Sequence, residues 1–143
     1  NKFFEKKMQQ TRGKFGLTMV SIKKTAAFFE EYKNIPTATI FGIDQSPRNP
    51  EKCYWMDFLN QETGVLFGLE KYAKEYNYPV LFCAISKIKR GYYTVRFSLV
   101  TDQPQASPHG SIIEDTTQRL EQQIIKNPQY WLWSHKRWKH KRK

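Results

Sequence analysis

Three parts of the chain carry apolar residues at the spacing of an amphipathic helix. They are residues Ile22 to Tyr32, Glu62 to Tyr76 and Ser111 to Lys126, in which apolar side chains recur mostly three or four positions apart. The first two segments run into an Asn-x-Pro sequence, which stops a helix. In the third, Ser111 and Glu114 have the S-x-x-E spacing of a capping box, so we expect that helix to begin there.

Five further segments have the β-branched, aromatic and apolar composition of strands. They are Gly16 to Val20, Thr37 to Ile43, Tyr54 to Leu59, Val80 to Ser86, and Tyr92 to Thr101. Arg90-Gly91 separates the last two and predicts a turn, so these two strands should form a hairpin. Residues Gln45 to Lys52 contain two prolines and are expected to form a loop.

The predicted order, β-α-β-loop-β-α-β-β-α, favours an α/β fold in which helices flank a mixed sheet that ends in an antiparallel hairpin. A chain of 143 residues is enough for one domain. However, only 39% of the residues are hydrophobic, and the chain begins in a charged segment without an initiator Met. We therefore expect a fragment whose fold is incomplete at the N-terminal side.

The charge of the chain predicts an anionic partner. Its formal net charge is +11 at pH 7, which suits a nucleic acid or an anionic membrane surface. The charge is concentrated near the C-terminus, where residues 127–143 contain six basic side chains and no acid. These basic residues are Lys136, Arg137, Lys139, Lys141, Arg142 and Lys143.

The cysteines and the hydropathy exclude several classes of protein. Cys53 and Cys83 have neither the spacing of metal ligands nor that of a disulfide framework, and we expect two free thiols in apolar surroundings. No apolar run approaches the roughly 18 residues of a transmembrane helix, so a membrane anchor would have to precede Asn1.

The most informative segment is Asn127 to Lys139, N-P-Q-Y-W-L-W-S-H-K-R-W-K, in which aromatic and basic residues are interleaved. Three interpretations are open: an aromatic face packed on a sheet, indole rings and lysines at a lipid headgroup layer, or aromatic rings stacked on nucleic acid bases. Trp131 and Trp138 lie seven positions apart and would share one side of a helix, so we expect this pair in the core.

This segment closely resembles the C-terminal signature of the bacterial lipid A biosynthesis acyltransferases, roughly N-P-E-x-W-x-W-x-H-R-R-W-K, with Lys136 in the place of the first arginine. The resemblance covers the whole chain, although the earlier elements are less specific. Arg12, in T-R-G-K-F-G, resembles an arginine-and-glycine element of the family. Asp44, in G-I-D-Q-S-P, resembles its D-x-x-P/G element at the end of a strand.

The resemblance implies a glycerolipid-acyltransferase-like fold, of which residues 1–143 would be the carboxy-terminal part of a single domain. It implies transfer of a fatty acyl chain from acyl carrier protein to a lipid A precursor, with no metal and no organic cofactor. The reaction would take place at the cytoplasmic face of the bacterial inner membrane, with the protein peripheral or anchored by a segment outside this sequence. Another glycolipid or lysolipid acceptor remains open. A nucleic-acid-binding domain also remains open on charge alone, but the chain lacks a recognisable reader motif and we expect no nucleic acid partner.

The family's chemistry depends on a His-x4-Asp/Glu pair, in which the histidine acts as general base. In the family this pair precedes the arginine element, so we expect it upstream of Asn1 and expect the 143-residue chain to be inactive. His109 and Glu114 have the same spacing. Because Glu114 is the predicted capping residue, we interpret these two residues as structural.

The predicted substrate-binding residues are Arg12, Asp44 and Arg48. An arginine suits phosphate oxygens because its guanidinium donates two parallel hydrogen bonds. Asp44 follows a predicted strand, where the ligand crevice of open α/β folds lies. For contact with the anionic membrane we expect Arg137, Lys139, Lys141, Arg142 and Lys143.

Overall fold

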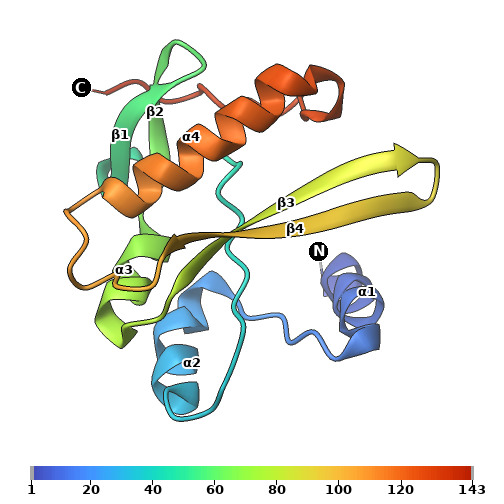
Figure 1. Ribbon diagram of the computed structural model, residues 1–143. Coiled ribbons are helices and arrows are strands. Elements are labelled where there is room, and N and C mark those ends of the chain that lie inside the picture. The colour runs from blue at the N-terminus through green and yellow to red at the C-terminus, as the bar shows by residue number, and fades with distance from the viewer. Residues whose placement is uncertain (1, 143) are drawn as a thin grey trace. The chain divides into compact units, whose positions relative to one another are not determined.

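The computed structural model describes residues 2–142 and divides the chain into two units, one ending at Ala38 and the other beginning at Thr39. Figure 1 shows the elements of both units. The first unit holds helix α1 (Lys2–Arg12), helix α2 (Thr25–Tyr32) and two short 3-10 turns, η1 (Gly13–Phe15) and η2 (Ile22–Lys24). No helix in residues 2–142 combines the length and apolar character needed to cross a bilayer.

The first unit confirms one predicted element and corrects another. The predicted helix over residues 22–32 is present as η2 followed directly by α2. The predicted strand over residues 16–20 is wrong, because these residues form an irregular segment. Leu17, Met19 and Val20 are all exposed, and no strand within residues 2–38 offers a partner for pairing.

The second unit contains all the strands of residues 2–142, arranged as two separate antiparallel pairs. Strands β1 (Cys53–Phe58) and β2 (Gln61–Leu66) form one pair. Strands β3 (Val80–Lys89) and β4 (Tyr92–Thr101) form the other, the hairpin that the Arg90-Gly91 turn predicts. Helices α3 (Gly68–Tyr76) and α4 (Ser111–Lys126) and the short turns η3 (Pro50–Lys52) and η4 (Pro128–Tyr130) complete this unit. The mixed α/β class is thereby confirmed.

Two predicted elements in this region are wrong. Residues 37–43 do not form a strand; Ile40 is exposed, and no neighbouring segment of the described chain pairs with them. The predicted helix over residues 62–76 exists only from Gly68 onward, because Gln61–Leu66 is strand β2. The β-branched Thr63 and Val65 favour a strand, and a helix would carry the cost of an interior glycine at Gly64.

The turn between β1 and β2 contains two residues, the commonest length for a hairpin. Phe58 pairs with Gln61, so only Leu59 and Asn60 connect the strands. Both have positive φ values, 51° and 59°, which is the geometry of a type I′ hairpin turn. Asparagine tolerates this conformation, whereas leucine does so at a cost. The backbone N–H of Leu59 donates to Glu121 Oε1 of α4 at 2.5 Å, and this contact helps to hold the turn.

Helix α4 is the element on which the second unit is assembled. It packs against β1, β3, β4 and α3, and Figure 1 shows it lying across the two hairpins. At its first turn Ile112 packs with Ala73 of α3 and Val80 of β3, and all three are buried. Leu69 and Val100 cover the edge of this core cluster.

A buried carboxylate from α3 caps the N-terminus of α4. Glu70 is fully buried and accepts hydrogen bonds from the backbone N–H groups of Gly110, Ile112 and Ile113 at 2.7, 3.2 and 3.3 Å. Lys74 pairs with the same carboxylate at 3.1 Å. The negative charge satisfies N–H groups that no helical carbonyl can reach, and it also complements the helix dipole.

The predicted capping box at this helix is therefore wrong. The hydroxyl of Ser111 donates to the carbonyl of Pro108 at 2.8 Å. Gly110, with φ 87°, is the residue that precedes the helix. A side chain at Gly110 would collide with the Tyr54 hydroxyl, so the close approach of β1 selects glycine there.

We expect Glu70→Ala to lower the free energy of unfolding by about 2–4 kcal/mol, because it leaves three buried N–H groups without their charged acceptor. Urea denaturation followed by circular dichroism measures this change. Glu75→Ala is the matched control, since Glu75 lies on the same helix and is exposed. Equal effects of the two substitutions would show that the Glu70 cap does not stabilise the fold.

Candidate functional site

The end of the chain runs along the β1–β2 hairpin as an irregular segment, which we call the C-terminal strap (residues 131–142). Three of its residues each contact one of three successive residues of β2. Arg137 Nη1 donates to the carbonyl oxygen of Gly64 at 2.8 Å, and Trp138 Nε1 donates to Thr63 Oγ1 at 2.8 Å. Arg142 lies 3.5 Å from the carboxylate of Glu62. The strap and the strand are thus joined over three adjacent positions of β2.

The strap also holds residues 44–47, which we call the Asp44 loop. The backbone N–H of Ser46 donates to His135 Nε2 at 2.9 Å, so this nitrogen carries no proton. His140 Nε2 lies 3.0 Å from the carbonyl oxygen of Pro47. Because a carbonyl can only accept, His140 must donate from this nitrogen. The two Nε2 atoms therefore play opposite roles, one accepting and one donating, and together they fix adjacent residues of one loop.

Arg137 is the most deeply buried side chain of the strap. It is only 3% exposed, and its guanidinium lies over the ring of Phe58 at 5.6 Å from the centroid. Burial lowers the pKa of Arg137, an effect partly opposed by the nearby Asp44 carboxylate and by Cys53. Arg137 Nε and Ser46 Oγ are buried and have no hydrogen-bond partner within residues 2–142. The strap thus places a positive charge behind the Asp44 loop.

Gly64 is required by the close packing around Arg137. A Cβ at this position would approach Cys53 Sγ to 2.7 Å. The Cys53 thiol donates to the carbonyl oxygen of Pro50 at 2.8 Å, and burial raises its pKa. A half-buried thiol with a raised pKa is a poor nucleophile, so Cys53 contributes packing to this site. Cys83, in contrast to the expectation of apolar burial, is exposed.

The tryptophans of the strap divide into two groups. Trp131 and Trp138 both pack on the buried Phe58, with ring centroids 6.0 and 6.4 Å away. Trp133 is exposed. This confirms the expected core pair, but the helical reason for it is wrong, because the strap contains no helix after Tyr130.

The structure distributes the predicted substrate-binding residues over two regions. Asp44 is half-buried in the loop that the strap holds, and Arg48 is exposed four residues further on. Arg12 ends α1 in the first unit and is exposed. The second unit therefore brings Asp44 together with Arg137, a residue predicted for a different role.

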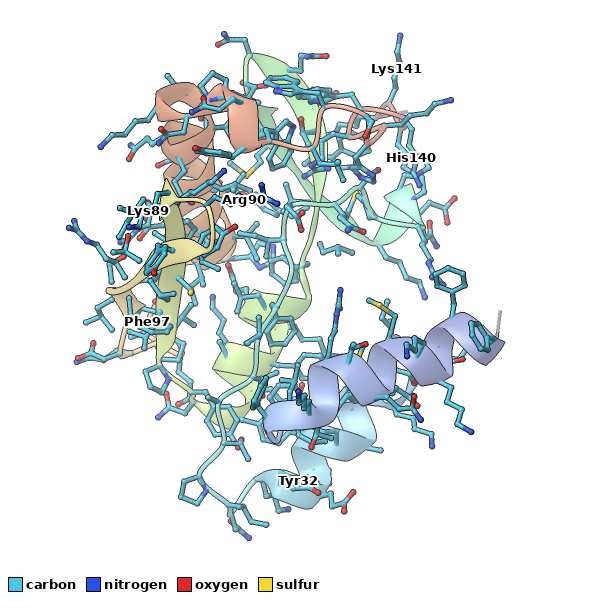
Figure 2. The ribbon with its side chains drawn as sticks, turned by 90° about the vertical axis from the view of Figure 1, so that its right-hand side faces the viewer. Tyr32, Lys89, Arg90, Phe97, His140 and Lys141 are labelled. Atoms are coloured by element: carbon cyan, nitrogen blue, oxygen red, sulfur yellow. The ribbon has the colours of Figure 1, made fainter. Side chains whose placement is uncertain are left out.

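The predicted membrane-contact residues need one correction. Arg137 is buried and cannot reach a lipid headgroup. Lys139, Lys141 and Arg142 are exposed, and Figure 2 shows His140 and Lys141 at the end of the strap. Lys143 lies outside the described residues.

His109 and Glu114 occupy structural positions. Glu114 accepts a hydrogen bond from the Tyr54 hydroxyl at 2.5 Å, and this bond, with partial burial, raises the pKa of Tyr54. His109 is exposed, and its ring packs against Phe67 at 4.9 Å between centroids. The carboxylate is therefore bonded to a tyrosine on β1 rather than available as a catalytic partner.

Three partners of the strap, Ser46, Pro47 and Gly64, are not predicted by the sequence. Their signal was weak, because each contributes a backbone group, and any residue has one. Gly64 alone carried a clue, since a glycine inside a strand often marks a close approach of another segment. Among residues 2–142 no three acidic, cysteine or histidine side chains converge as a metal site would require.

Comparison with known proteins identifies one family. The family described as bacterial lipid A biosynthesis acyltransferase matches residues 1–140. No curated protein and no solved structure matches the chain. The matched region includes the Asp44 loop, both strands of the β1–β2 hairpin and the strap as far as His140.

We expect His135→Ala to speed amide hydrogen exchange at Ser46 by about 2- to 12-fold, the equivalent of one lost hydrogen bond of 0.5–1.5 kcal/mol. The effect should be confined to the Asp44 loop, as measured by exchange and NMR or mass spectrometry. Lys136→Ala, which changes an exposed neighbour, is the control. His135→Gln should restore part of the protection, because its amide oxygen can accept the same bond. An unchanged exchange rate at Ser46 would contradict the hydrogen bond from the Ser46 N–H to His135.

Proposed function

The chain belongs to the bacterial lipid A biosynthesis acyltransferase family, and from this membership we propose that it is part of an enzyme that transfers a fatty acyl chain from acyl carrier protein to a hydroxyl group of a lipid A precursor. The observation that carries the proposal is the family match over residues 1–140. The strap supports it, since His135 of the family's C-terminal signature holds the Asp44 loop and Arg137 of the same signature binds β2.

Within this proposal the Asp44 loop forms part of the acceptor site. Its backbone is fixed at Ser46 and Pro47 by two histidines, and the positive charge of Arg137 lies behind it. A loop held in this way can keep a carboxylate in position against a sugar or phosphate, because little conformational entropy is lost when the ligand binds. Arg48, which is exposed in the second unit, is the candidate for binding an acceptor phosphate there. Arg12, which is exposed in the first unit, is a separate candidate for binding phosphate.

We place the reaction at the cytoplasmic face of the inner membrane, where both the acyl carrier protein and the lipid acceptor can reach the enzyme. Three exposed basic residues of the strap, Lys139, Lys141 and Arg142, support attraction to anionic lipids. Each basic residue near such a surface contributes about 1 kcal/mol. Arg137 takes no part in this contact.

We expect the 143-residue chain alone to show no acyl transfer. Its sequence offers one His-x4-Glu spacing, His109 to Glu114, and Glu114 is bonded to Tyr54. Without a general base the rate should fall by about 10²- to 10⁴-fold. The assay follows radiolabelled acyl groups from acyl carrier protein to a lipid A precursor. Transfer by the wild-type chain that disappears in His109→Ala would overturn the assignment of a structural role.

We expect Asp44→Ala and Arg12→Ala to impair transfer in a form of the protein that carries a His-x4-carboxylate pair. Loss of a charge-assisted phosphate bond at Arg12 should cost about 1.5–3 kcal/mol in kcat/KM. The matched controls are Asp57→Ala and Lys6→Ala, which change exposed charges on β1 and α1. If the Asp44 and Arg12 variants fold normally and match their controls in steady-state kinetics, the assignment of these two residues fails.

A further inference from the structure

The β3–β4 hairpin has one face lined by exposed apolar side chains. Residues paired directly across an antiparallel sheet point to the same side, and the register pairs Leu81 with Leu99, Cys83 with Phe97, and Ile85 with Val95. All six of these residues are exposed, Phe97 to 68%. We call them the bare face.

The opposite face of the hairpin is contacted by α4, although Ser86, Thr94 and Arg96 on that face remain exposed. Arg119 Nη1 donates to the hydroxyl of Ser98, on a residue next to Phe97 in the strand, at 2.8 Å. Arg119 is itself held by a two-bond contact with Asp115, one helical turn earlier on α4. The hairpin therefore has a supported inner face and an apolar outer face.

The turn of the hairpin adds further exposed apolar side chains and positive charge. Tyr93 pairs with Lys87 on the side of the bare face, whereas Tyr92, the neighbouring residue in the strand, points to the other side. Ile88, Tyr92 and Tyr93 are each more than half exposed. Lys87, Lys89 and Arg90 lie among them, and Lys89 Nζ is 4.4 Å from the ring centroid of Tyr92. Figure 2 shows Lys89 and Arg90 together at the turn, with Phe97 further along the hairpin.

The charges of the hairpin indicate which kind of partner would bind its apolar face. Residues 80–101 contain four basic residues and no acid. Aromatic rings such as tyrosine favour the headgroup layer of a bilayer, and lysine stems can lie along apolar surface while their ammonium groups reach lipid phosphates. An apolar face on a hairpin whose charged residues are all cations fits an anionic lipid surface, because both the hydrophobic and the electrostatic contributions then favour binding.

We propose that the β3–β4 hairpin is the membrane-contact element of this chain, with its turn and bare face entering the interfacial layer of an anionic bilayer. The inference deepens the proposed function, on which it rests for the presence of a lipid acceptor. It assigns the principal contact to the hairpin and a secondary, electrostatic contribution to the exposed basic residues of the strap.

A sedimentation experiment tests the element responsible. The 143-residue chain is mixed with vesicles of phosphatidylcholine and phosphatidylglycerol, or of phosphatidylcholine alone. We expect the triple variant Ile88→Ser, Tyr92→Ser, Tyr93→Ser to lose at least about tenfold in partition to the anionic vesicles, since three apolar side chains leave the interface. The matched control changes exposed apolar residues elsewhere: Ile40→Ser, Ile125→Ser and Leu132→Ser.

A fluorescent label tests the geometry without disturbing the apolar residues of the turn. Cys83 lies on the bare face and is exposed, so it can carry an environment-sensitive dye in a Cys53→Ala background. We expect a blue shift on addition of anionic vesicles and quenching by lipids that bear a spin label in the upper acyl chain. A dye on Gln122→Cys, an exposed position of α4, should show neither effect.

Two results would overturn the inference. In the first, the chain sediments with anionic vesicles while the Cys83 dye reports no change and the turn variant binds as the wild type does. In the second, the chain is a dimer by sedimentation velocity, the dye responds to protein concentration, and vesicles have no effect, so that a second copy covers the bare face. Either result leaves the acyl transfer proposal standing. Conversely, if a form of the protein that carries the catalytic pair showed no acyl transfer, the proposed function would fail, but binding of the hairpin to anionic vesicles would still be measurable and would still support the inference.

Discussion

The carboxylate of Glu70 lies fully buried at the N-terminus of α4, among three backbone N–H groups and the ammonium of Lys74. A charge in such a place is expensive to desolvate, and only this complete set of partners offsets the cost. The contact fixes the first turn of α4 against α3. Along the rest of the helix, Glu114 reaches β1, Arg119 reaches β4 and Glu121 reaches the β1–β2 turn. One buried charge therefore sets the position of the helix that both hairpins depend on.

Local pattern predicts the elements whose partners are close in sequence. The β3–β4 hairpin follows from two apolar runs around Arg90-Gly91, and α4 from its helical spacing. The pattern fails where composition and pairing disagree. Residues 37–43 have the composition of a strand but no neighbour to pair with, and Val65 and Leu66 fit a helical spacing although they belong to β2. A strand exists only with a partner, and this information is not local.

The site was predictable in its residues more than in its arrangement. The aromatic and basic signature pointed to the last part of the chain, and Asp44 was a candidate from its motif. That the two meet depends on bonds between residues 89 and 93 positions apart, from His135 to Ser46 and from His140 to Pro47. On the loop side, these hydrogen bonds use backbone groups, which nearly every residue has, so the sequence does not indicate them. For the same reason Arg137 looked like one more surface cation, although it is the buried centre of the strap.

The long sequence separation of the strap from its loop has a consequence for biosynthesis. A ribosome adds His135 to the chain 89 residues after Ser46. At the usual rate of translation, the synthesis of these residues takes about 5 to 20 seconds. During that interval the β1–β2 hairpin and the loop exist without the side chains that cover Phe58 and Gly64. A segment synthesised long after the loop is thus the part that closes this region, and a nascent chain halted short of the strap would present an open hairpin to chaperones and proteases.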